Sequence, residues 1–280
     1  MGTGSIGLLI IMFTVFFSYR GLKDHRFYKH FAFYVDKVLV EKEYRRLITS
    51  GFLHVNWMHL IFNMIALYAF SASIEAYLGP LNFLLLYFIS LLSGNLFSLF
   101  IHRHHGAYGS VGASGAISGI VFASIALFPG IHIGFFFLPL SIPAWIYGLV
   151  YVLYSIYGIR SRRDNVGHES HLAGAVTGML LVLLWEPSAL VRNYVPIIAI
   201  LVPALIFIYI IITRPQLLLI DNRFFKYQQR FHSIEDRYNT EKLDRQKQID
   251  MILEKIHQKG MKSLTKKERE ILAKYSNTVR

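Results

Sequence analysis

The chain has 280 residues, of which 54% are hydrophobic and only 16% are charged. It contains no cysteine, which excludes disulfide bonds and thiolate metal sites. The formal net charge of +12 falls in loops and in a basic C-terminal tail, so we expect the anionic headgroups of a lipid bilayer, and not nucleic acid, as its counterpart. Residues 104–159 contain no Asp, Glu, Lys or Arg, which excludes an ordinary soluble domain. The composition therefore predicts an all-α polytopic membrane protein.

Seven apolar segments approach the roughly 20 residues that a membrane-spanning helix needs. They cover residues 5–19, 57–74, 81–101, 113–128, 142–158, 170–185 and 194–213. The first begins close to Met1, lacks a basic region before it and has no small-residue cleavage pattern after it, so we expect a retained span and not a removed signal peptide. The first, fourth, fifth and sixth are short, which suits helices that border a water-filled cavity.

Two connecting stretches carry structure of their own. Residues 20–53 interleave aromatic side chains with Lys and Arg, which is typical of an element lying at the membrane interface. Residues 131–140 are apolar but are interrupted and flanked by prolines. We expect this second stretch to be re-entrant, because it is too interrupted to span.

The C-terminal tail is predicted to form a small helical appendage. Apolar residues follow helical spacing from Ile249 to Ile256, and Gly260 marks a stop. Thr265 and Glu268 then form a capping box for a last helix. Nothing in this tail indicates chemistry.

A serine and a histidine on two apolar segments form the candidate reaction centre. Ser114 opens the fourth segment between small residues, and His171 lies near the start of the sixth. Both segments carry a small-xxx-small groove, formed by Gly115 and Gly119 on one and by Gly174 and Gly178 on the other. If these grooves pack together, Ser114 and His171 can share a hydrogen bond and act as a nucleophile and its base.

The second segment supplies polar groups of another kind. His59 and Asn63 are four residues apart and therefore share a helix face. Their N–H groups, with the backbone amide of Ser114 at a helix start, are the donors that an oxyanion hole uses. Each residue alone has a structural explanation in helix packing, but their occurrence together on three segments favours catalysis.

A metal site is the main alternative for the histidines. His54, His59, His168 and His171 offer four ring nitrogens, and an open zinc site needs only three ligands. Such sites usually add a carboxylate, however, and Glu169 points off the face that the last two histidines share. We therefore expect no metal.

The middle of the chain, at about residues 44–185, resembles the rhomboid family of intramembrane serine proteases. The resemblance is carried by residues in the family's order and on its helices, namely Arg46, Leu47, Thr49, Ser50, His54, Met58, His59, Leu60, Asn63, Glu75, Gly79, Tyr87, Gly112, Ser114, Gly115, His168, His171, Leu172, Gly174 and Gly178. It implies a catalytic dyad of Ser114 and His171 without a carboxylate, and oxyanion stabilisation by His59, Asn63 and the Ser114 amide. Supporting roles are expected for His54, Gly112, Gly115, His168, Gly174 and Arg46.

The resemblance also implies an architecture. We expect a rhomboid-like six-helix bundle at residues 1–190, a seventh C-terminal transmembrane helix at 191–213 and a basic helical soluble tail at 214–280. The fifth span and the loop at 160–166 would act as the substrate gate.

The implied function is cleavage of single-span transmembrane proteins by a serine endopeptidase without cofactors. The main alternative is a non-catalytic rhomboid-like protein that binds transmembrane clients, and a membrane transporter or metal-binding protein is a third possibility. The chain is expected in a bacterial inner membrane as a multi-pass protein. The family places its active-site loops on the outer side, whereas the distribution of Lys and Arg favours the cytoplasmic side. On the resemblance, we expect the active site on the outer side.

Three departures from the family pattern stand out. The family often has an aromatic residue four positions after the nucleophile, stacked on the base, and Ser118 occupies that place. Arg45 stands where a tryptophan usually precedes the loop arginine. The seventh span and the tail extend beyond the six-helix core.

Overall fold

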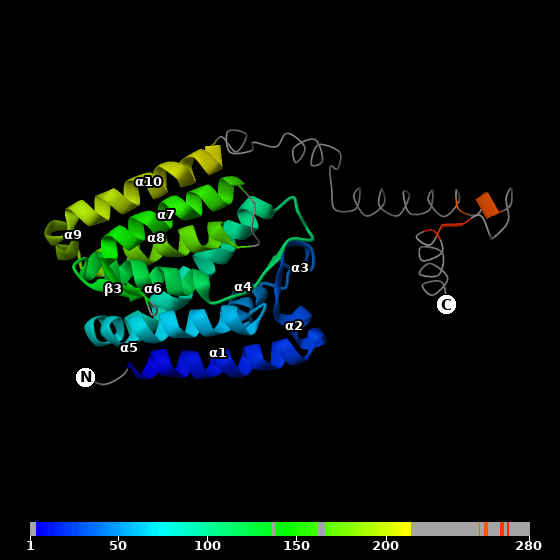
Figure 1. The fold of residues 1–280 in the computed structure, drawn as a ribbon, viewed down its shortest axis with the longest axis horizontal. Coiled ribbons are helices and arrows are strands. Elements are labelled where there is room, and N and C mark those ends of the chain that lie inside the picture. The colour runs from blue at the N-terminus through cyan, green and yellow to red at the C-terminus, as the bar shows by residue number, and fades with distance from the viewer. Residues whose placement is uncertain are drawn as a thin grey trace. The chain divides into compact units, whose positions relative to one another are not determined.

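The computed structural model describes residues 4–135, 138–161 and 166–213, together with residues 252, 255, 256, 264, 265 and 268 of the tail. The chain divides into two compact units, residues 1–221 and 222–280, and each is considered by itself. In the first unit the helices are α1 (Ser5–Lys23), α2 (His25–Phe31), α3 (Val35–Leu39), α4 (Arg46–Thr49), the 3-10 turn η1 (Ser50–Phe52), α5 (Trp57–His102), α6 (Ser114–Leu127), α7 (Ala144–Ser161), α8 (His168–Trp185), α9 (Ser188–Arg192) and α10 (Tyr194–Thr213) (Figure 1). The strands are β1 (Phe33–Tyr34), β2 (Gly109–Ser110), β3 (His132–Phe135) and β4 (Leu138–Pro143). The described fold is thus mainly helical, as predicted.

Three of the described helices, α1, α5 and α10, are long and apolar enough to cross a membrane. The longest, α5, consists of two helices joined at Gly79, whose φ of +80° lies in the region that favours glycine. Pro80 follows directly and has no N–H to continue the helical hydrogen bonds. The second and third predicted spans are therefore the two halves of α5.

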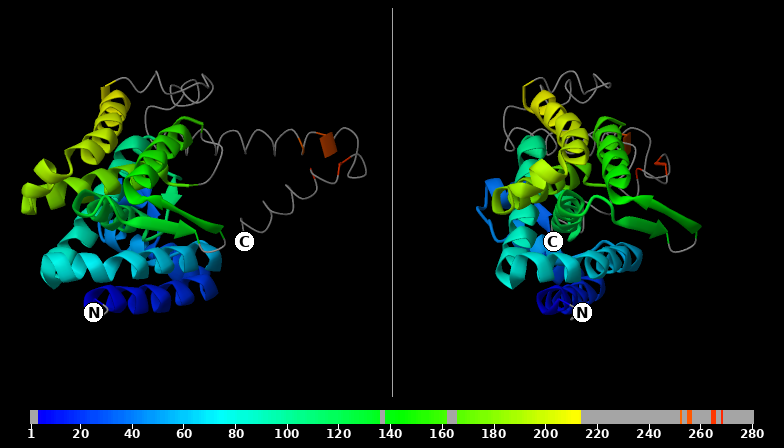
Figure 2. Two further views of the ribbon diagram at one scale, coloured as in Figure 1. Left: turned by 60° about the vertical axis from the view of Figure 1, so that its left-hand side comes forward. Right: turned by 90° about the vertical axis from the view of Figure 1, so that its left-hand side faces the viewer.

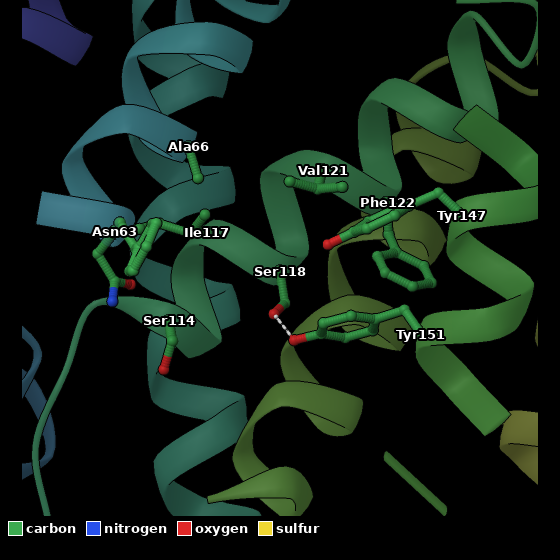
Figure 3. Close-up of a pocket in the computed structure, with 10 residues that line it drawn as sticks. Asn63, Ala66, Ser114, Ile117, Ser118, Val121, Phe122, Tyr147 and Tyr151 are labelled. Carbon is green, nitrogen blue, oxygen red and sulfur yellow. Dashed lines mark hydrogen bonds between the residues drawn. The ribbon is translucent and has the colours of Figure 1, made fainter. Parts of the chain in front are cut away.

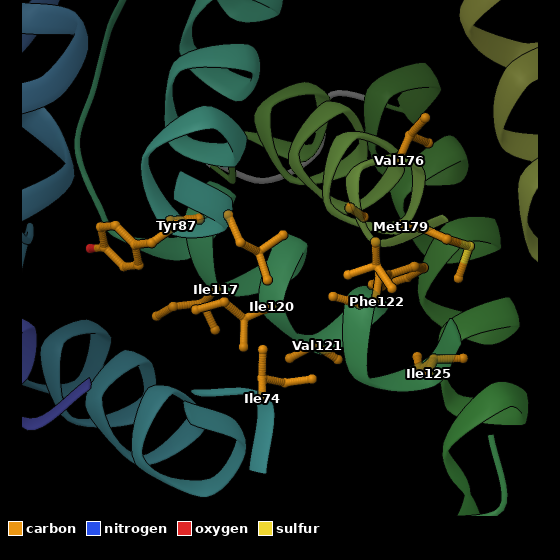
Figure 4. Packing of buried hydrophobic residues seen from close by; sticks show 14 of the residues in the cluster. Ile74, Tyr87, Ile117, Ile120, Val121, Phe122, Ile125, Val176 and Met179 are labelled. Carbon is orange, nitrogen blue, oxygen red and sulfur yellow. The ribbon is translucent and has the colours of Figure 1, made fainter. Parts of the chain in front are cut away.

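Helix α6 forms the centre of the bundle. Every residue from Gly115 to Leu127 is buried, and the helix packs mainly against α5 and α8. Figure 4 shows its side chains between Ile74 and Tyr87 of α5 and Met179 of α8. With 14 residues, α6 is about 21 Å long, shorter than the hydrocarbon layer of about 30 Å. One of its ends must therefore lie at membrane depth.

The two predicted glycine grooves hold α6 against α8. A Cβ placed on Gly174 would overlap the carbonyl oxygen of Gly115, and one placed on Gly178 would overlap that of Gly119. The two backbones are thus in direct contact, with no room for a methyl group. This contact confirms the predicted packing of the fourth and sixth segments.

The seventh predicted span, α10, packs along α7 (Figure 1). Its buried residues lie on one stripe, at Ile197, Ile200, Ala204, Phe207 and Ile211. On α7, a Cβ placed on Gly148 would come within 2.8 Å of Ile125 Cδ1 of α6 and 3.0 Å of Ile200 Cδ1 of α10. Helix α7 therefore packs closely against both α6 and α10 at this level.

A buried carboxylate fixes the start of α1. Glu75 of α5 accepts hydrogen bonds from the backbone N–H groups of Ile6 at 3.1 Å and Gly7 at 3.0 Å. These groups lie in the first turn, where a helix has no internal acceptors. The negative charge also suits the positive end of the helix dipole.

The connection at residues 20–53 folds into short helices and the strand β1, which pairs antiparallel with β2. Arg46 of α4 is buried within this connection and donates from Nη1 to the carbonyl oxygens of Lys29 at 2.7 Å and Ala32 at 2.6 Å. This guanidinium ties α4 to the chain in and after α2. The supporting role expected for Arg46 is consistent with these contacts.

The stretch expected to be re-entrant contains a β-hairpin. Strand β3 pairs antiparallel with β4, with Ile133 opposite Ile142. The hairpin projects to one side of the helices (Figure 2). Its re-entrant position in a membrane stays a prediction.

In the second unit, the predicted capping box is present. Thr265 N donates to Glu268 Oε2 at 2.7 Å, and Glu268 N donates to Thr265 Oγ1 at 3.3 Å. Lys255 Nζ donates to the same carboxylate at 2.8 Å. The predicted stop at Gly260 and most of the two predicted tail helices lie outside the described residues, as do positions 162–165 of the gate loop.

The glycine contact leads to a stability prediction. In Gly174→Ala the new methyl group meets a backbone oxygen that cannot rotate away, an overpacking that should cost about 3 kcal/mol. Alanine favours the helix over glycine by about 1 kcal/mol, which offsets part of this cost. The free energy of unfolding should therefore fall by about 2 kcal/mol. Thermal unfolding in detergent measures this. Gly130→Ala, where a Cβ would meet no atom within 4 Å, is the control. Equal stability of the two variants would contradict the contact.

Candidate active site

The glycine contact brings the predicted nucleophile and base together. Ser114 is the first residue of α6, and His171 lies in the first turn of α8. The distance from His171 Nε2 to Ser114 Oγ is 2.6 Å. This is the hydrogen bond that the sequence predicts. When Nε2 accepts from the hydroxyl, Nδ1 of the neutral imidazole carries the ring's proton, so the ring is ready to act as a base.

A strained glycine turns the chain into α6. Gly112 has a φ of +136°, in the region that favours glycine, and its N–H donates to the carbonyl oxygen of Ser50 at 3.0 Å. A Cβ at this position would lie 3.1 Å from His59 Nε2 and 3.5 Å from Ser114 Oγ. The missing side chain therefore leaves room between these two groups, where a reacting atom could lie.

The first turns of α5 position the predicted donors. Asn56 caps the helix by accepting from His59 N at 2.8 Å. Asn63 Nδ2 donates to His59 O, also at 2.8 Å. Because an amide nitrogen carries two hydrogens, this bond orients Asn63 and leaves a second hydrogen for a ligand. His59 and Asn63 thus lie one turn apart on one face of α5, and their role as oxyanion donors stays a prediction.

A cavity of about 160 Å³ opens beside Ser114 (Figure 3). Side-chain polar groups from all three contributing helices reach it, and the rest of its lining is apolar. The lining residues are Phe62, Asn63, Ala66, Ser114, Ile117, Ser118, Val121, Phe122, Tyr147 and Tyr151. The lining is contributed by α5, α6 and α7.

His54 stands behind His59. Ser18 Oγ donates to the carbonyl oxygen of Phe52 at 2.7 Å and therefore accepts from His54 Nδ1, which lies 2.8 Å away. The rings of His54 and His59 meet edge to face, with 4.8 Å between their centroids. Burial, with a smaller effect of His59, lowers the pKa of His54 to about 3, so this ring is neutral in ordinary buffers.

His168 packs between α7 and α8. It is buried, its ring lies edge to face with Tyr154 at 5.1 Å, and a Cβ placed on Gly158 would overlap it. Over the described ranges, no three His, Asp or Glu side chains gather in a way that could hold a metal ion. The four histidines of the metal alternative instead pack against rings, hydroxyls and a glycine.

Sequence reasoning did not find the role of Glu169. This carboxylate is buried at the start of α8, and its Oε1 accepts from Tyr108 OH at 2.6 Å, His102 Nε2 at 3.1 Å and Ser98 Oγ at 3.2 Å. The rings of His102 and Tyr108 stack at 3.6 Å. Burial and the adjacent Glu169 raise the pKa of Tyr108, which stays a donor. This cluster ties the start of α8 to the end of α5. The sequence signal that could have indicated this role is an acidic residue at the start of an apolar helix.

The comparisons with known proteins agree with this arrangement. The Rhomboid domain family matches residues 41–188, and a family of unknown function (DUF6576) matches residues 232–278. The chain is 35% identical over 150 residues to Rhomboid protein 1, mitochondrial, of Saccharomyces cerevisiae, which covers 51% of this chain and 43% of the relative. It is 33% identical over 144 residues to Putative rhomboid protease YdcA of Bacillus subtilis, covering 51% and 67%.

Another relative is Inactive rhomboid protein 1 of Drosophila melanogaster, 28% identical over 149 residues, covering 53% of this chain and 10% of the relative. The chain spans about half the length of the curated relatives that it matches first. Their names place these three in mitochondria or chloroplasts, so the comparisons do not support the expected bacterial inner membrane.

The Glu169 cluster leads to a second stability prediction. Glu169→Gln keeps the volume but removes the charge, and bonds to a charged acceptor contribute about 1.5–3 kcal/mol against 0.5–1.5 kcal/mol for neutral ones. The free energy of unfolding should therefore fall by about 2 kcal/mol. Glu186→Gln is the control, because its carboxylate is partly exposed and lies 3.8 Å from Arg192, a pair with little expected effect. Denaturation in detergent measures the free energy of unfolding of both variants. Equal values for Glu169→Gln and Glu186→Gln would contradict the cluster's role.

Proposed function

Because the chain belongs to the rhomboid family, we propose that it is an intramembrane serine endopeptidase that cleaves transmembrane protein substrates through Ser114 and His171. The chain is a multi-pass integral membrane protein, and members of its family act on transmembrane substrates in the bilayer. The observation that carries the proposal is the 2.6 Å distance between His171 Nε2 and Ser114 Oγ beside a cavity. The location of the chain in a bacterial cell membrane stays a prediction.

The proposed first step is attack by Ser114 on the scissile carbonyl carbon. His171 Nε2 takes the hydroxyl proton as the new C–O bond forms, and the carbonyl oxygen gains negative charge. When the C–N bond breaks, the same nitrogen returns the proton to the leaving amine. Water, activated by His171 in turn, then attacks the acyl-enzyme and regenerates the Ser114 hydroxyl.

Donors on two helices face the developing oxyanion. Asn63 has its second amide hydrogen, and the N–H of Ser114 lies in the first turn of α6, where no internal acceptor exists and the helix dipole is positive. His59 Nε2, across Gly112, is the third candidate. One such donor contributes about 3 kcal/mol to the stability of the transition state.

The substrate proposal follows from where the site lies. A peptide bond in a transmembrane helix is shielded by its backbone hydrogen bonds, so cleavage requires a segment that unwinds. We expect a single-span protein with small or helix-breaking residues near the cleavage position. Helix α7 lines the cavity through Tyr147 and Tyr151, which supports the proposal that it acts as the gate.

The alternative is a non-catalytic protein that binds transmembrane clients. One observation favours it, namely that a relative carries the name Inactive rhomboid protein 1. The intact hydrogen bond between Ser114 and His171 favours the protease. A fluorophosphonate probe separates the two, because it reacts only with an activated serine.

We predict that Ser114→Ala abolishes both cleavage of a single-span substrate and fluorophosphonate labelling, with thermal stability unchanged. Ser124→Ala is the control, because Ser124 is buried in the same helix away from the cavity. Labelling and gel-based cleavage assays measure both effects. Continued cleavage by Ser114→Ala would remove this serine from the mechanism.

We predict that Asn63→Ala lowers kcat by about 10²–10³, since one oxyanion donor is lost. The matched control is Asn82→Ala, because Asn82 Nδ2 makes the same kind of bond to the carbonyl oxygen four residues earlier in α5, at 3.1 Å, but lies outside the cavity. Steady-state kinetics on the same substrate compare them. A similar kcat for both variants would exclude Asn63 as an oxyanion donor.

A further inference from the structure

An aromatic ring from α7 lies against the candidate base. The rings of Tyr151 and His171 are stacked with 6.3 Å between their centroids and 24° between their planes. This separation lies within the range of offset-stacked pairs. Ser118, in the place four residues after Ser114, supplies no ring, but its Oγ is hydrogen-bonded to Tyr151 OH at 2.8 Å (Figure 3).

Further contacts fix the position of this tyrosine. Its ring centroid lies 5.6 Å from that of Phe122 on α6 and 5.9 Å from that of Tyr147 on α7. The hydroxyl is held by Ser118, so both ends of the side chain have partners. A ring held in this way can restrict the orientation of the imidazole that it covers.

We propose that Tyr151 is a positioning residue for His171, and that the orientation of the base therefore depends on the position of α7. This inference rests on the proposed function. The buried carboxylate of Glu169 is hydrogen-bonded to Ser98, His102 and Tyr108. Among the described residues, Tyr151 supplies the ring that stacks on His171.

The position of α7 links this role to substrate entry. Helix α7 also rests on α10, and its Gly148 faces both Ile125 of α6 and Ile200 of α10. A movement of α7 away from α6 to widen the cavity would carry Tyr151 away from both Ser118 and His171. The base would then regain its orientation only when α7 returns, so a chain with an open gate would have a less reactive serine.

The test compares Tyr151→Leu with Tyr151→Phe, using the full chain in detergent. Leu removes the ring, whereas Phe keeps the ring and loses only the bond to Ser118. The rate of Ser114 labelling by a fluorophosphonate probe and kcat on a single-span substrate should fall about twofold to tenfold in Tyr151→Leu, with KM little changed. Tyr151→Phe should keep most of the wild-type rate.

The matched control is Tyr157→Leu, because Tyr157 is an exposed tyrosine of the same helix. In the Tyr157→Leu variant, the probe should label Ser114 at the wild-type rate. Wild-type labelling of Tyr151→Leu would overturn the inference, and so would equal losses in the Leu and Phe variants. Labelling of Ser114→Ala at the wild-type rate would instead overturn the proposed function.

A double-mutant cycle keeps the inference testable if Tyr151→Leu does not fold. Ser118→Ala and Tyr151→Phe remove the two partners of one hydrogen bond. Their effects on the labelling rate should be small and similar, and the double variant should be no slower than either single variant. Fully additive losses would show that the two side chains act separately and would overturn the inference.

Discussion

The close contact of two helix backbones is the constraint on which the rest of this structure depends. Gly115 and Gly174 meet without side chains between α6 and α8, and the first turns of both helices are brought together. Larger residues would separate the axes and break the 2.6 Å contact of Ser114 with His171. In a membrane, where no hydrophobic effect drives helices together, such close packing is a main source of association.

The site is then held from several directions by groups outside it. Glu169 ties the start of α8 to the end of α5, and Tyr151 covers the imidazole from α7. His54 lies behind His59 with its tautomer set by Ser18. The described contacts thus hold the site through packing and through hydrogen bonds, including those to the charged carboxylate of Glu169.

Local sequence patterns predicted the features that depend on spacing along one helix. The glycine grooves, the pair of Ser114 and His171, and the Asn63 face follow from helical periodicity, and the tail's capping box follows from a short motif. The Glu169 cluster and the stack of Tyr151 on His171 were not predicted, because their partners lie on different helices. Periodicity gives the faces of a helix but not how each helix is rotated against its neighbours.

The most direct test of the central claim is an experimental structure of the chain after reaction with an isocoumarin inhibitor that acylates serine. We predict a covalent bond to Ser114 Oγ, with the imidazole of His171 beside it and the Gly115 and Gly174 backbones still in contact. An adduct on another residue, or a structure in which α6 and α8 stand apart at these glycines, would contradict the account.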